Sequence, residues 1–244
     1  MVHSTGTGTG NDVVNRDDQA YMRRALELAE RGRGRVSPEP LVGCVIVNGG
    51  QVVAEAWRAD SSQPAAESVA LQAAAGAASG ATAYLTLEPA PGEPNAAGAR
   101  ALIDAGIRRV VVAALQPEPT VQGASVAALQ RGGVEITTGV LQDEANRQNE
   151  VYRTNRLLGR PYLLFVTAMS LDGKVATRTG AGNRLIGDAA RALVHEWRNE
   201  YDGVGIDVGT VLAIDPALTT HLADPNKSTL SDAPTEPNAA LPGR

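Results

Sequence analysis

Cysteine and aromatic residues are scarce in this chain. Cys44 is the single cysteine among 244 residues, and aromatic residues make up 3% of the sequence. One cysteine excludes a disulfide within the chain and is typical of a reducing compartment. We expect Cys44, in the segment Val-Gly-Cys-Val-Ile-Val, to be a small buried strand residue. With so few aromatic side chains, the core has to be packed from Ala, Val and Leu.

Long apolar runs and a surplus of positive charge are also missing. No apolar segment reaches the length of a membrane span, and residues 1–17 lack the apolar centre of a secretory signal. Lys and Arg number 22 against 27 Asp and Glu, a net charge of −5. This balance leaves little positive charge to neutralise phosphates. We therefore expect a cytoplasmic protein with neither a membrane nor a nucleic acid as its partner.

Hydrophobic residues, 43% of the chain, follow patterns that predict an α/β domain in its first part. Two apolar segments around Asn48-Gly49-Gly50 are typical of a β-hairpin. After the hairpin, segments with helical spacing alternate with short β-branched segments. The expected helices are 19–31, 65–78, 97–105 and 123–131, with a polar helical stretch at 142–157, and the expected strands are 41–47, 51–56, 83–87, 108–114 and 134–137. This order predicts a three-layer α/β/α sandwich around a buried sheet.

A second, smaller unit is expected after Arg160-Pro161. Its expected elements are an almost continuously apolar strand at 162–169, a helix at 188–200 and a strand at 203–208. The predicted organisation is a disordered tail (1–17), a first domain (18–148), a linker (149–160), a partial second domain (161–222) and a disordered polar tail (223–244). Because the strand at 162–169 shows no polar alternation, it requires cover on both faces. We expect that cover to come from the first domain or from another chain.

Several short motifs occur in both units. The first unit carries Ser37-Pro-Glu-Pro40 and Thr86-Leu-Glu-Pro89, and the second carries Arg160-Pro-Tyr162 and Ala168-Met-Ser-Leu-Asp-Gly-Lys174. In their order and spacing, these motifs resemble the bifunctional riboflavin-biosynthesis deaminase/reductase family (RibD type). The resemblance implies a cytidine-deaminase-like domain followed by an incomplete dihydrofolate-reductase-like α/β domain. It also implies zinc-dependent deamination of a phosphoribosylated diaminopyrimidinone, followed by NADPH-dependent reduction of its ribose.

The positions at which this family would hold its zinc carry no metal-binding side chain. The resemblance places one His and two Cys ligands at Ala65, Ala90 and Gly98, and none of these side chains can donate a lone pair. Glu67, the proton shuttle that the resemblance implies, is retained, so we expect a vestigial catalytic residue and no bound zinc. Two other interpretations stay open. Glu67 is a carboxylate that stabilises a helix start, or it forms a hard-metal site with Glu88 and Glu93.

The reductase half keeps only part of the family's contact set. The resemblance assigns Met169 and Thr210 to the cofactor, and Arg198 and Leu218 to the substrate. The plain alternatives are a solvated helix-end cation for Arg198 and an ordinary strand-to-turn residue for Thr210. The Glu-Gly-Gly segment that would hold the NADPH phosphates does not occur before Arg244. We therefore expect the chain to bind no NADPH, and NADPH binding is the less favoured alternative.

These departures predict a homologue that has lost zinc-dependent pyrimidine deaminase activity and NADPH reductase activity. It would act as a pseudoenzyme that binds a small pyrimidine or phosphoribosyl ligand, in a pocket where Glu39 replaces the family's substrate-holding Asn. The alternative is a repurposed or partner-completed enzyme of the NADPH-dependent 5-amino-6-(5-phosphoribosylamino)uracil reductase type. A homo-oligomer, or a heteromer with an intact paralogue, is the expected assembly.

Overall fold

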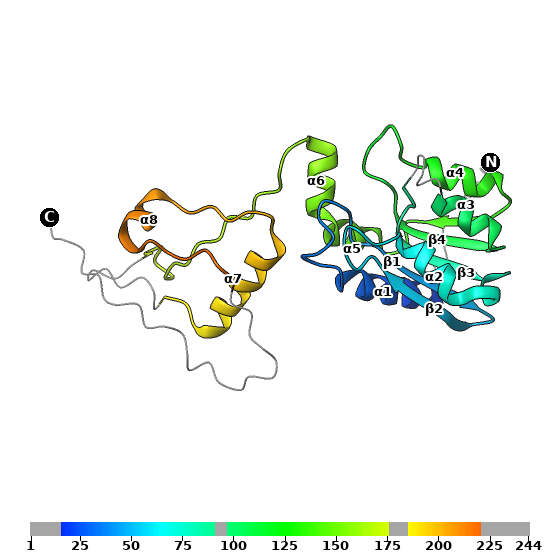
Figure 1. Cartoon of the computed structure of the whole chain (residues 1–244), viewed down its shortest axis with the longest axis horizontal. Helices are drawn as coiled ribbons and strands as arrows, with labels where there is room; N and C mark the ends of the chain where they lie inside the picture. The colour runs from blue at the N-terminus through cyan, green and yellow to red at the C-terminus, as the bar shows by residue number, and fades with distance from the viewer. Residues whose placement is uncertain (1–15, 91–96, 176–184, 221–244) are drawn as a thin grey trace, which may run out of the picture. The chain divides into compact units, whose positions relative to one another are not determined.

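The chain divides into two compact units, with the boundary between Tyr162 and Leu163 (Figure 1). The structure is a computed structural model and describes residues 16–90, 97–175 and 185–220. The predicted tail at 223–244, and the predicted tail at 1–17 except for its last two residues, lie outside the described residues. No helix in the described ranges is long and apolar enough to cross a membrane.

Unit 1 is built on a five-stranded sheet with the order β2-β1-β3-β4-β5. β1 is antiparallel to β2 and β3, whereas β3, β4 and β5 run parallel to one another. Gly49 and Gly50 adopt φ values of 58° and 79° in the hairpin turn, a conformation that glycine adopts without strain. The strands lie close to their predicted positions, at β1 Gly43–Asn48, β2 Gln51–Trp57, β3 Thr82–Leu87, β4 Arg109–Ala114 and β5 Glu135–Thr138.

Helices cover both faces of this sheet, which confirms the three-layer α/β/α prediction (Figure 1). Val110 and Val112 face the layer of α2, α3 and α4, while Val111 faces α1 and α5, because successive strand residues point to opposite faces. All three valines are fully buried, so β4 is apolar and buried on both faces after Arg109. The helices are α1 Arg16–Glu30, α2 Ala66–Ala74 with the 3₁₀ turn η1 Ala75–Ala78, α3 Ala97–Asp104, α4 Ala124–Arg131, α5 Gln142–Gln148 and α6 Glu150–Leu158.

A largely buried ion pair fastens α1 to β4, an interior strand of the sheet. Asp18 accepts hydrogen bonds from Nη1 and Nη2 of Arg109 at 2.9 and 2.8 Å, and from the Tyr84 hydroxyl at 2.8 Å. Burial raises the pKa of Asp18, but the hydrogen bonds from Arg109 and Tyr84 outweigh it and lower the pKa below its usual range. The charged carboxylate therefore stabilises the folded state.

α1 also approaches β1 so closely that only a glycine fits at the contact. A Cβ placed on Gly43 would overlap with the backbone carbonyl of Ala25. The Gly43 N–H donates to Oγ1 of Thr86 at 3.0 Å, which ties β1 to β3. Because the atoms that a Cβ at position 43 would meet belong to the backbone of α1, no side chain can move aside, and this position requires glycine.

The predicted linker at 149–160 is largely helical and belongs to unit 1. Asn149 is buried, and its side chain forms two hydrogen bonds with the backbone of Leu41: the Leu41 N–H donates to Oδ1 at 2.8 Å and Nδ2 donates to the Leu41 carbonyl at 2.9 Å. Tyr162, just after α6, donates a hydrogen bond to Glu150 at 2.9 Å. These contacts attach the segment to the first unit.

Unit 2 contains the predicted helix at 188–200, but the two strands predicted in it are wrong. Its described elements are α7 Asp188–Glu200 and α8 Val208–Ile214. Residues 163–169 are extended without strand pairing, and Leu163 and Phe165 are 80% and 88% exposed. An apolar strand requires partners on its edges and cover on its faces. No described residue of unit 2 is buried, so neither requirement is met within the described part of this unit.

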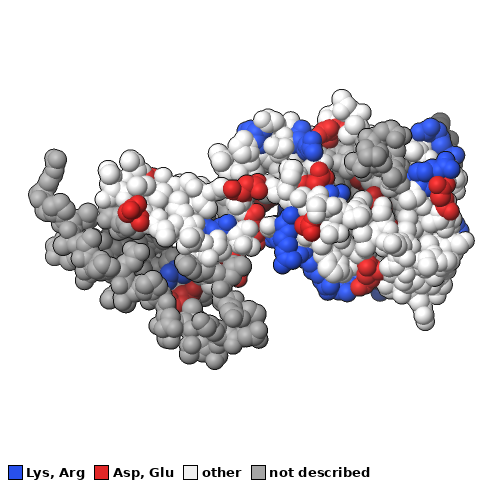
Figure 2. Space-filling model, in the orientation of Figure 1, with Lys and Arg blue, Asp and Glu red and all other residues white. Residues whose placement is uncertain are grey.

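Charged side chains of both signs are interspersed on the face of unit 1 seen in Figure 2. Many charged side chains of unit 1 pair locally: Arg24 bonds to Glu55 through Nε and Nη2, both at 2.7 Å, and Arg100 bonds to Asp104 at 2.9 Å. Such partly or fully exposed pairs contribute little to stability.

Candidate functional site: a pocket without zinc ligands

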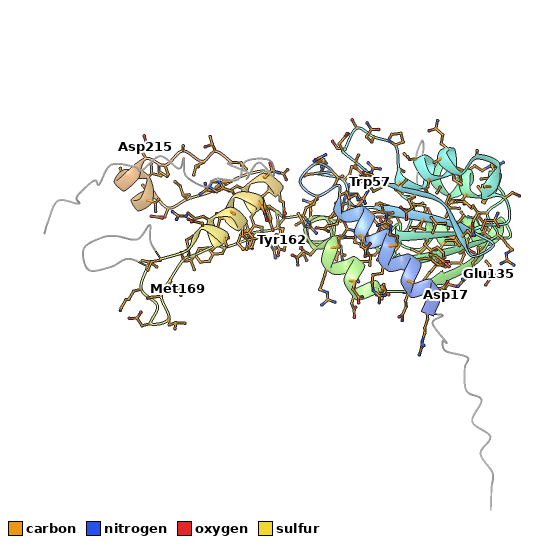
Figure 3. The ribbon with its side chains drawn as sticks, turned by 90° about the horizontal axis from the view of Figure 1, so that it is seen from below. Asp17, Trp57, Glu135, Tyr162, Met169 and Asp215 are labelled. Atoms are coloured by element: carbon orange, nitrogen blue, oxygen red, sulfur yellow. The ribbon has the colours of Figure 1, made fainter. Side chains whose placement is uncertain are left out.

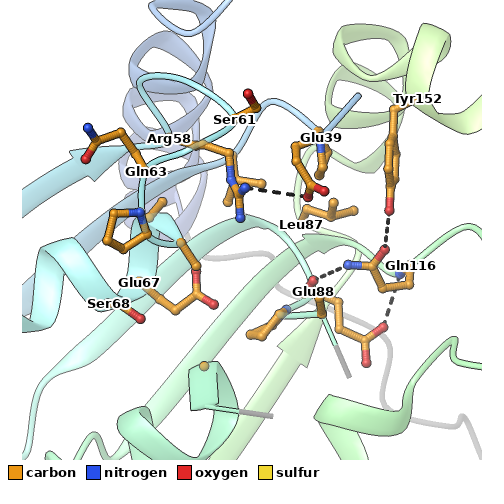
Figure 4. Close-up of a pocket in the computed structure, with 18 residues that line it drawn as sticks. Glu39, Arg58, Ser61, Gln63, Glu67, Ser68, Leu87, Glu88, Gln116 and Tyr152 are labelled. Carbon is orange, nitrogen blue, oxygen red and sulfur yellow. Dashed lines mark hydrogen bonds and ion pairs between the residues drawn. The ribbon is translucent and has the colours of Figure 1, made fainter. Parts of the chain in front are cut away.

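A cavity of about 430 Å³ opens in unit 1 where β3 ends and α2 and α3 begin (Figure 4). The carboxyl end of a parallel strand is where α/β proteins commonly place ligands, because the following loop turns away there. The cavity wall includes Glu39, Glu67 and the three positions that the resemblance assigns to zinc ligands. The lining residues in the described ranges include Glu39, Val42, Arg58, Gln63, Pro64, Ala65, Glu67, Leu87, Glu88, Pro89, Ala90, Gly98, Gln116 and Tyr152.

Glu67 lies in the first turn of α2 and is only 4% exposed. Burial raises the pKa of its carboxyl group, an effect that the positive charge of Arg58 partly offsets. In the described residues, no other side chain hydrogen-bonds to this carboxyl group, and Figure 4 shows it directed into the cavity. Its position at a helix start agrees with the plain interpretation of a helix-end carboxylate. Its burial at a cavity is what a ligand-binding role requires.

The residues at the positions that the resemblance assigns to metal ligands do not fit a zinc ion. Ala65 and Ala90 end in methyl groups, and Gly98 has no side chain, so none supplies the soft donor that zinc prefers. A Cβ on Gly98 would overlap with Oε1 of Glu67 and lie 3.1 Å from Cβ of Pro89. The carboxyl group thus occupies the space into which a ligand at position 98 would extend. No group of three His, Cys, Asp or Glu residues within the described ranges is arranged to hold a metal.

Glu88, the second member of the alternative hard-metal site, has a structural role instead. Its carboxylate is 1% exposed and accepts four backbone N–H groups. Oε2 accepts from Gln116 at 3.1 Å and Gly123 at 2.9 Å, and Oε1 from Ser125 at 2.9 Å and Val126 at 3.2 Å. These bonds hold the β4–α4 loop and the start of α4, and they leave no free lone pair directed at a metal. Glu93, the third member, lies outside the described residues.

Arg58 and Glu39 form an ion pair across the cavity, with Nη1 of Arg58 3.5 Å from Oε2 of Glu39. Arg58 follows β2, and Glu39 lies in the loop before β1. In Figure 4 the guanidinium group projects toward both Glu39 and Glu67. The Arg58 Nε atom is buried and has no hydrogen-bond partner in the described residues. Arg58 received no role from the sequence, because nothing in its local pattern reveals that the end of β2 meets the loop at residue 39.

A hydrogen-bonded chain from α6 forms another wall of the cavity. The Tyr152 hydroxyl donates to Oε1 of Gln116 at 3.2 Å, and Nε2 of Gln116 donates to the Glu88 carbonyl at 2.7 Å. Sequence reasoning missed both Tyr152 and Gln116, because their partners lie 36 and 28 residues away along the chain. A helix that the sequence assigned to a linker therefore contributes to the pocket.

Cys44 is fully buried in β1, as expected for a strand residue. Burial raises the pKa of its thiol well above the usual range, with a smaller contribution from Glu67. A protonated, inaccessible thiol is a poor nucleophile. Cys44 is therefore a packing residue.

The four candidate residues of unit 2 lie on different segments. Met169 is 54% exposed on the extended segment, Arg198 lies in the last turn of α7, and Leu218 follows α8 at 39% exposure. Thr210 lies in the first turn of α8, where its N–H donates to Oδ1 of Asp207, the N-cap, at 2.9 Å. In Figure 3 Met169 and Asp215, at the end of α8, lie well apart within unit 2. No hydrogen bond or ion pair in the described residues joins any two of the four.

The fold and the pocket together define a cytidine-deaminase-like protein in unit 1. The family model for the cytidine and deoxycytidylate deaminase zinc-binding region matches residues 15–114. The model for the RibD C-terminal domain matches residues 161–239.

Full-length relatives identify the family. The riboflavin biosynthesis protein RibD of Actinobacillus pleuropneumoniae is 38% identical over 213 residues, covering 87% of this chain and 57% of its own length. RibD of Escherichia coli strain K12 is 38% identical, with 87% and 58% covered. The solved structure of Acinetobacter baumannii RibD (form 2) is 38% identical with a TM-score of 0.78, covering 86% of this chain and 59% of that chain.

This chain belongs to the RibD family of riboflavin-biosynthesis proteins. It spans less than two thirds of the length of these relatives.

Proposed function

We propose that unit 1 is a zinc-free pocket that binds a small pyrimidine-like or phosphoribosyl ligand without deaminating it. One observation carries this proposal. The three positions that the resemblance assigns to metal ligands hold Ala65, Ala90 and Gly98, and the Glu67 carboxyl group fills the space beside Gly98.

The chemistry of deamination supports this reading. A zinc ion lowers the pKa of its bound water from 15.7 to about 7, which supplies the nucleophile at neutral pH. Without the metal, Glu67 faces a water molecule that is almost entirely protonated. Burial raises the pKa of the Glu67 carboxyl group, but a carboxylate is still a far weaker base than hydroxide and cannot deprotonate bulk-like water to an appreciable extent. The pocket keeps the shape of a binding site while lacking the group that activates water.

The direct test is the metal content of the purified full chain, measured together with ammonia release from an aminopyrimidine nucleotide. We expect substoichiometric zinc and no ammonia release above the uncatalysed rate, with added zinc making no difference. Stoichiometric zinc or enzyme-like ammonia release would refute the proposal.

A restoration variant tests the residue mapping. Ala65→His, Ala90→Cys and Gly98→Cys together supply a ligand set that zinc prefers. We expect the triple variant to bind zinc with Glu67 displaced toward the cavity, because the new side chain at position 98 competes for its space. A folded triple variant that binds no zinc would show that the three positions do not converge on one site. Ala73→His, at an exposed position on the same helix as Glu67 and outside the pocket lining, is a control for adventitious binding.

A second function is favoured by the match of residues 161–239 to the RibD C-terminal domain. In this alternative, unit 2 is part of an NADPH-dependent reductase that a partner chain completes. The solved structure of a diaminohydroxyphosphoribosylaminopyrimidine deaminase/5-amino-6-(5-phosphoribosylamino)uracil reductase from Thermotoga maritima is 36% identical to this chain with a TM-score of 0.78. NADPH fluorescence titration of this chain distinguishes the two. We expect no saturable binding in the micromolar range, whereas saturable binding would favour the reductase.

The assembly is a further part of the proposal. We propose that the chain forms a homo-oligomer or pairs with an intact family member, and that it works in the cytoplasm. Size-exclusion chromatography of the chain, alone and mixed with an intact RibD, tests this. A monomeric elution volume in both runs would contradict it.

A further inference from the structure

The hairpin of unit 1 carries the one Asn-Gly sequence in the chain. Asn48 is the last residue of β1, and Gly49 and Gly50 form the turn before β2. Every other asparagine is followed by a residue that has a side chain. Such a side chain shields the peptide nitrogen after an asparagine from reaction. Asn48 lacks this protection, because glycine carries only a hydrogen atom in that place.

The peptide nitrogen of Gly49 is open to solvent. Both Gly49 and Gly50 are exposed, and a Cβ placed on either would meet no other atom within 4 Å. Among the residues that the structure describes, no acceptor takes a hydrogen bond from the Gly49 N–H. This nitrogen is therefore accessible to water and is not held in the ladder of the hairpin.

The Asn48 side chain links the hairpin to the segment after α2. Its Nδ2 donates to the carbonyl of Ala77 at 2.8 Å and to the carbonyl of Ser79 at 3.1 Å. Ala77 lies in the 3₁₀ turn η1, and Ser79 follows that turn. On the other side of the hairpin turn, the Tyr21 hydroxyl donates to the Gly50 carbonyl at 2.9 Å. One amide nitrogen thus makes both side-chain bonds between the hairpin and η1.

We propose that Asn48 is a site of spontaneous deamidation, and that the reaction breaks the link between the hairpin and η1. The Gly49 nitrogen loses its proton to water and attacks Cγ of Asn48. The new N–Cγ bond replaces the Cγ–Nδ2 bond, and Nδ2 leaves as ammonia after it takes a proton from water. The cyclic imide that remains is opened by a water molecule at either carbonyl, which yields aspartate or isoaspartate. Water is the co-reactant in both steps.

The product cannot make the bonds that Asn48 makes. A carboxylate accepts hydrogen bonds but donates none, so at position 48 it faces the Ala77 and Ser79 carbonyls without a proton to share. Isoaspartate also adds one carbon atom to the backbone at the position paired with Gln51. Asn48, Ala77 and Ser79 lie outside the cavity lining, so this inference is independent of the proposed function.

The same bonds control the rate of the reaction. For Cγ to reach the Gly49 nitrogen, the Asn48 side chain has to rotate away from Ala77 and Ser79. The folded chain therefore reacts through a local opening of the turn. The bond from Tyr21 to Gly50 opposes this opening, and the loss of one hydrogen bond changes such an equilibrium by about two- to tenfold.

The experiment follows the wild-type full chain over time in neutral buffer by peptide mapping with mass spectrometry. We expect the mass gain of an amide-to-acid conversion, together with isoaspartate, at position 48 before any other asparagine. The other asparagines are internal controls, since none precedes a glycine. Conversion at Asn48 that is no faster than at these positions would overturn the proposal.

Two tyrosine variants test whether the turn controls the rate. In Tyr21→Phe we expect conversion at Asn48 to be at least about twofold faster than in the wild type. Tyr162→Phe is the matched control, because it removes a hydroxyl that bonds to Glu150, away from the hairpin. An unchanged rate in Tyr21→Phe, or an equal increase in both variants, would contradict control by the turn.

A product mimic tests the structural consequence. Asn48→Asp installs the deamidated side chain, and we expect its Tm to be lower than that of the wild type by at least about 2 °C. Gln51→Glu adds the same charge to the same hairpin at an exposed position, and its Tm is expected to stay at the wild-type value. Equal Tm values for Asn48→Asp and the wild type, or equal decreases in the two variants, would show that the bonds to η1 are not what the reaction breaks.

Discussion

Replacing Glu88 by Gln tests whether this residue is a structural centre of the pocket wall. The carboxylate accepts four backbone N–H groups, two on each oxygen, from residues of the β4–α4 loop and the first turn of α4. An amide keeps one acceptor oxygen and replaces the other with an NH₂ group, which faces two N–H donors. Two of the four bonds are therefore lost and replaced by a donor–donor contact.

The magnitude follows from the strength of hydrogen bonds to a charged group. Each contributes about 1.5–3 kcal/mol, so the loss of two predicts a decrease of about 3–6 kcal/mol in the free energy of unfolding. Domains of this kind are stable by about 5–15 kcal/mol, so Glu88→Gln is expected to remain folded only marginally. The released loop also carries Gln116, so the wall of the cavity is expected to loosen with it.

The assay is urea unfolding followed by the fluorescence of Trp57, in a Trp197→Phe background that removes the second tryptophan. Glu135→Gln is the matched control, because Glu135 lies in the same unit with its side chain 65% exposed. We expect the control to change the free energy of unfolding by less than about 0.5 kcal/mol. A decrease of less than about 1 kcal/mol in Glu88→Gln would refute the structural role. Wild-type protein that binds a divalent cation and loses it in Glu88→Gln would favour the hard-metal alternative.

Three further predictions concern the framework that holds the pocket. The pKa of Asp18 is lowered in the folded state, so its ion pair with Arg109 contributes stability above the usual pKa of about 3.9, and that stability is lost as the pH falls through the lowered value. In acid titrations followed by circular dichroism, we expect Asp18→Asn to be less stable than the wild type at neutral pH and to lose less stability on acidification. Parallel titration curves for the two proteins would contradict this. Asn149→Ala removes both hydrogen bonds to the Leu41 backbone, and we expect a loss of about 2 kcal/mol in chemical unfolding, whereas an unchanged midpoint would show that water replaces the amide. Gly43→Ala brings a methyl group onto the backbone of α1, and a decrease of at least about 3 kcal/mol, or failure to fold, is expected in thermal unfolding; wild-type stability would mean that the helix shifts freely.

The sequence predicted the elements of unit 1 well because each local signal agrees with the tertiary structure. Gly49 and Gly50 form the turn that their composition predicts, with both φ values positive. Val110 to Val112 form a strand buried on both faces, as a continuous apolar run indicates. The absence of a metal-binding side chain at position 65 and at position 90 is readable directly from residue identity.

The roles of other residues depend on contacts that no local pattern encodes. Glu88 followed a strand and was weighed as a metal ligand, but its four donors come from 28 to 38 residues further along the chain. Arg58 meets Glu39 only because the loops before β1 and after β2 lie together. In unit 2 the apolar residues 162–169 satisfied the pattern of a strand, yet a strand forms only with neighbours. Hydrophobic periodicity shows which side chains of a segment can be buried, but it does not show whether neighbouring strands or helices are present to cover them.

The bond between Asn149 and Leu41 joins positions 108 residues apart. The loop before β1 is consequently fixed by a side chain that emerges from synthesis long after the sheet's first three strands. Contacts of such long range form late, since the intervening chain must first lose its freedom. A fragment that ends at β5 would retain every strand of the unit 1 sheet and most of the core. It would nevertheless lack the hydrogen bonds from Asn149 that fix the loop before β1 at the rim of the cavity. Any excised version of this domain should therefore extend through α6.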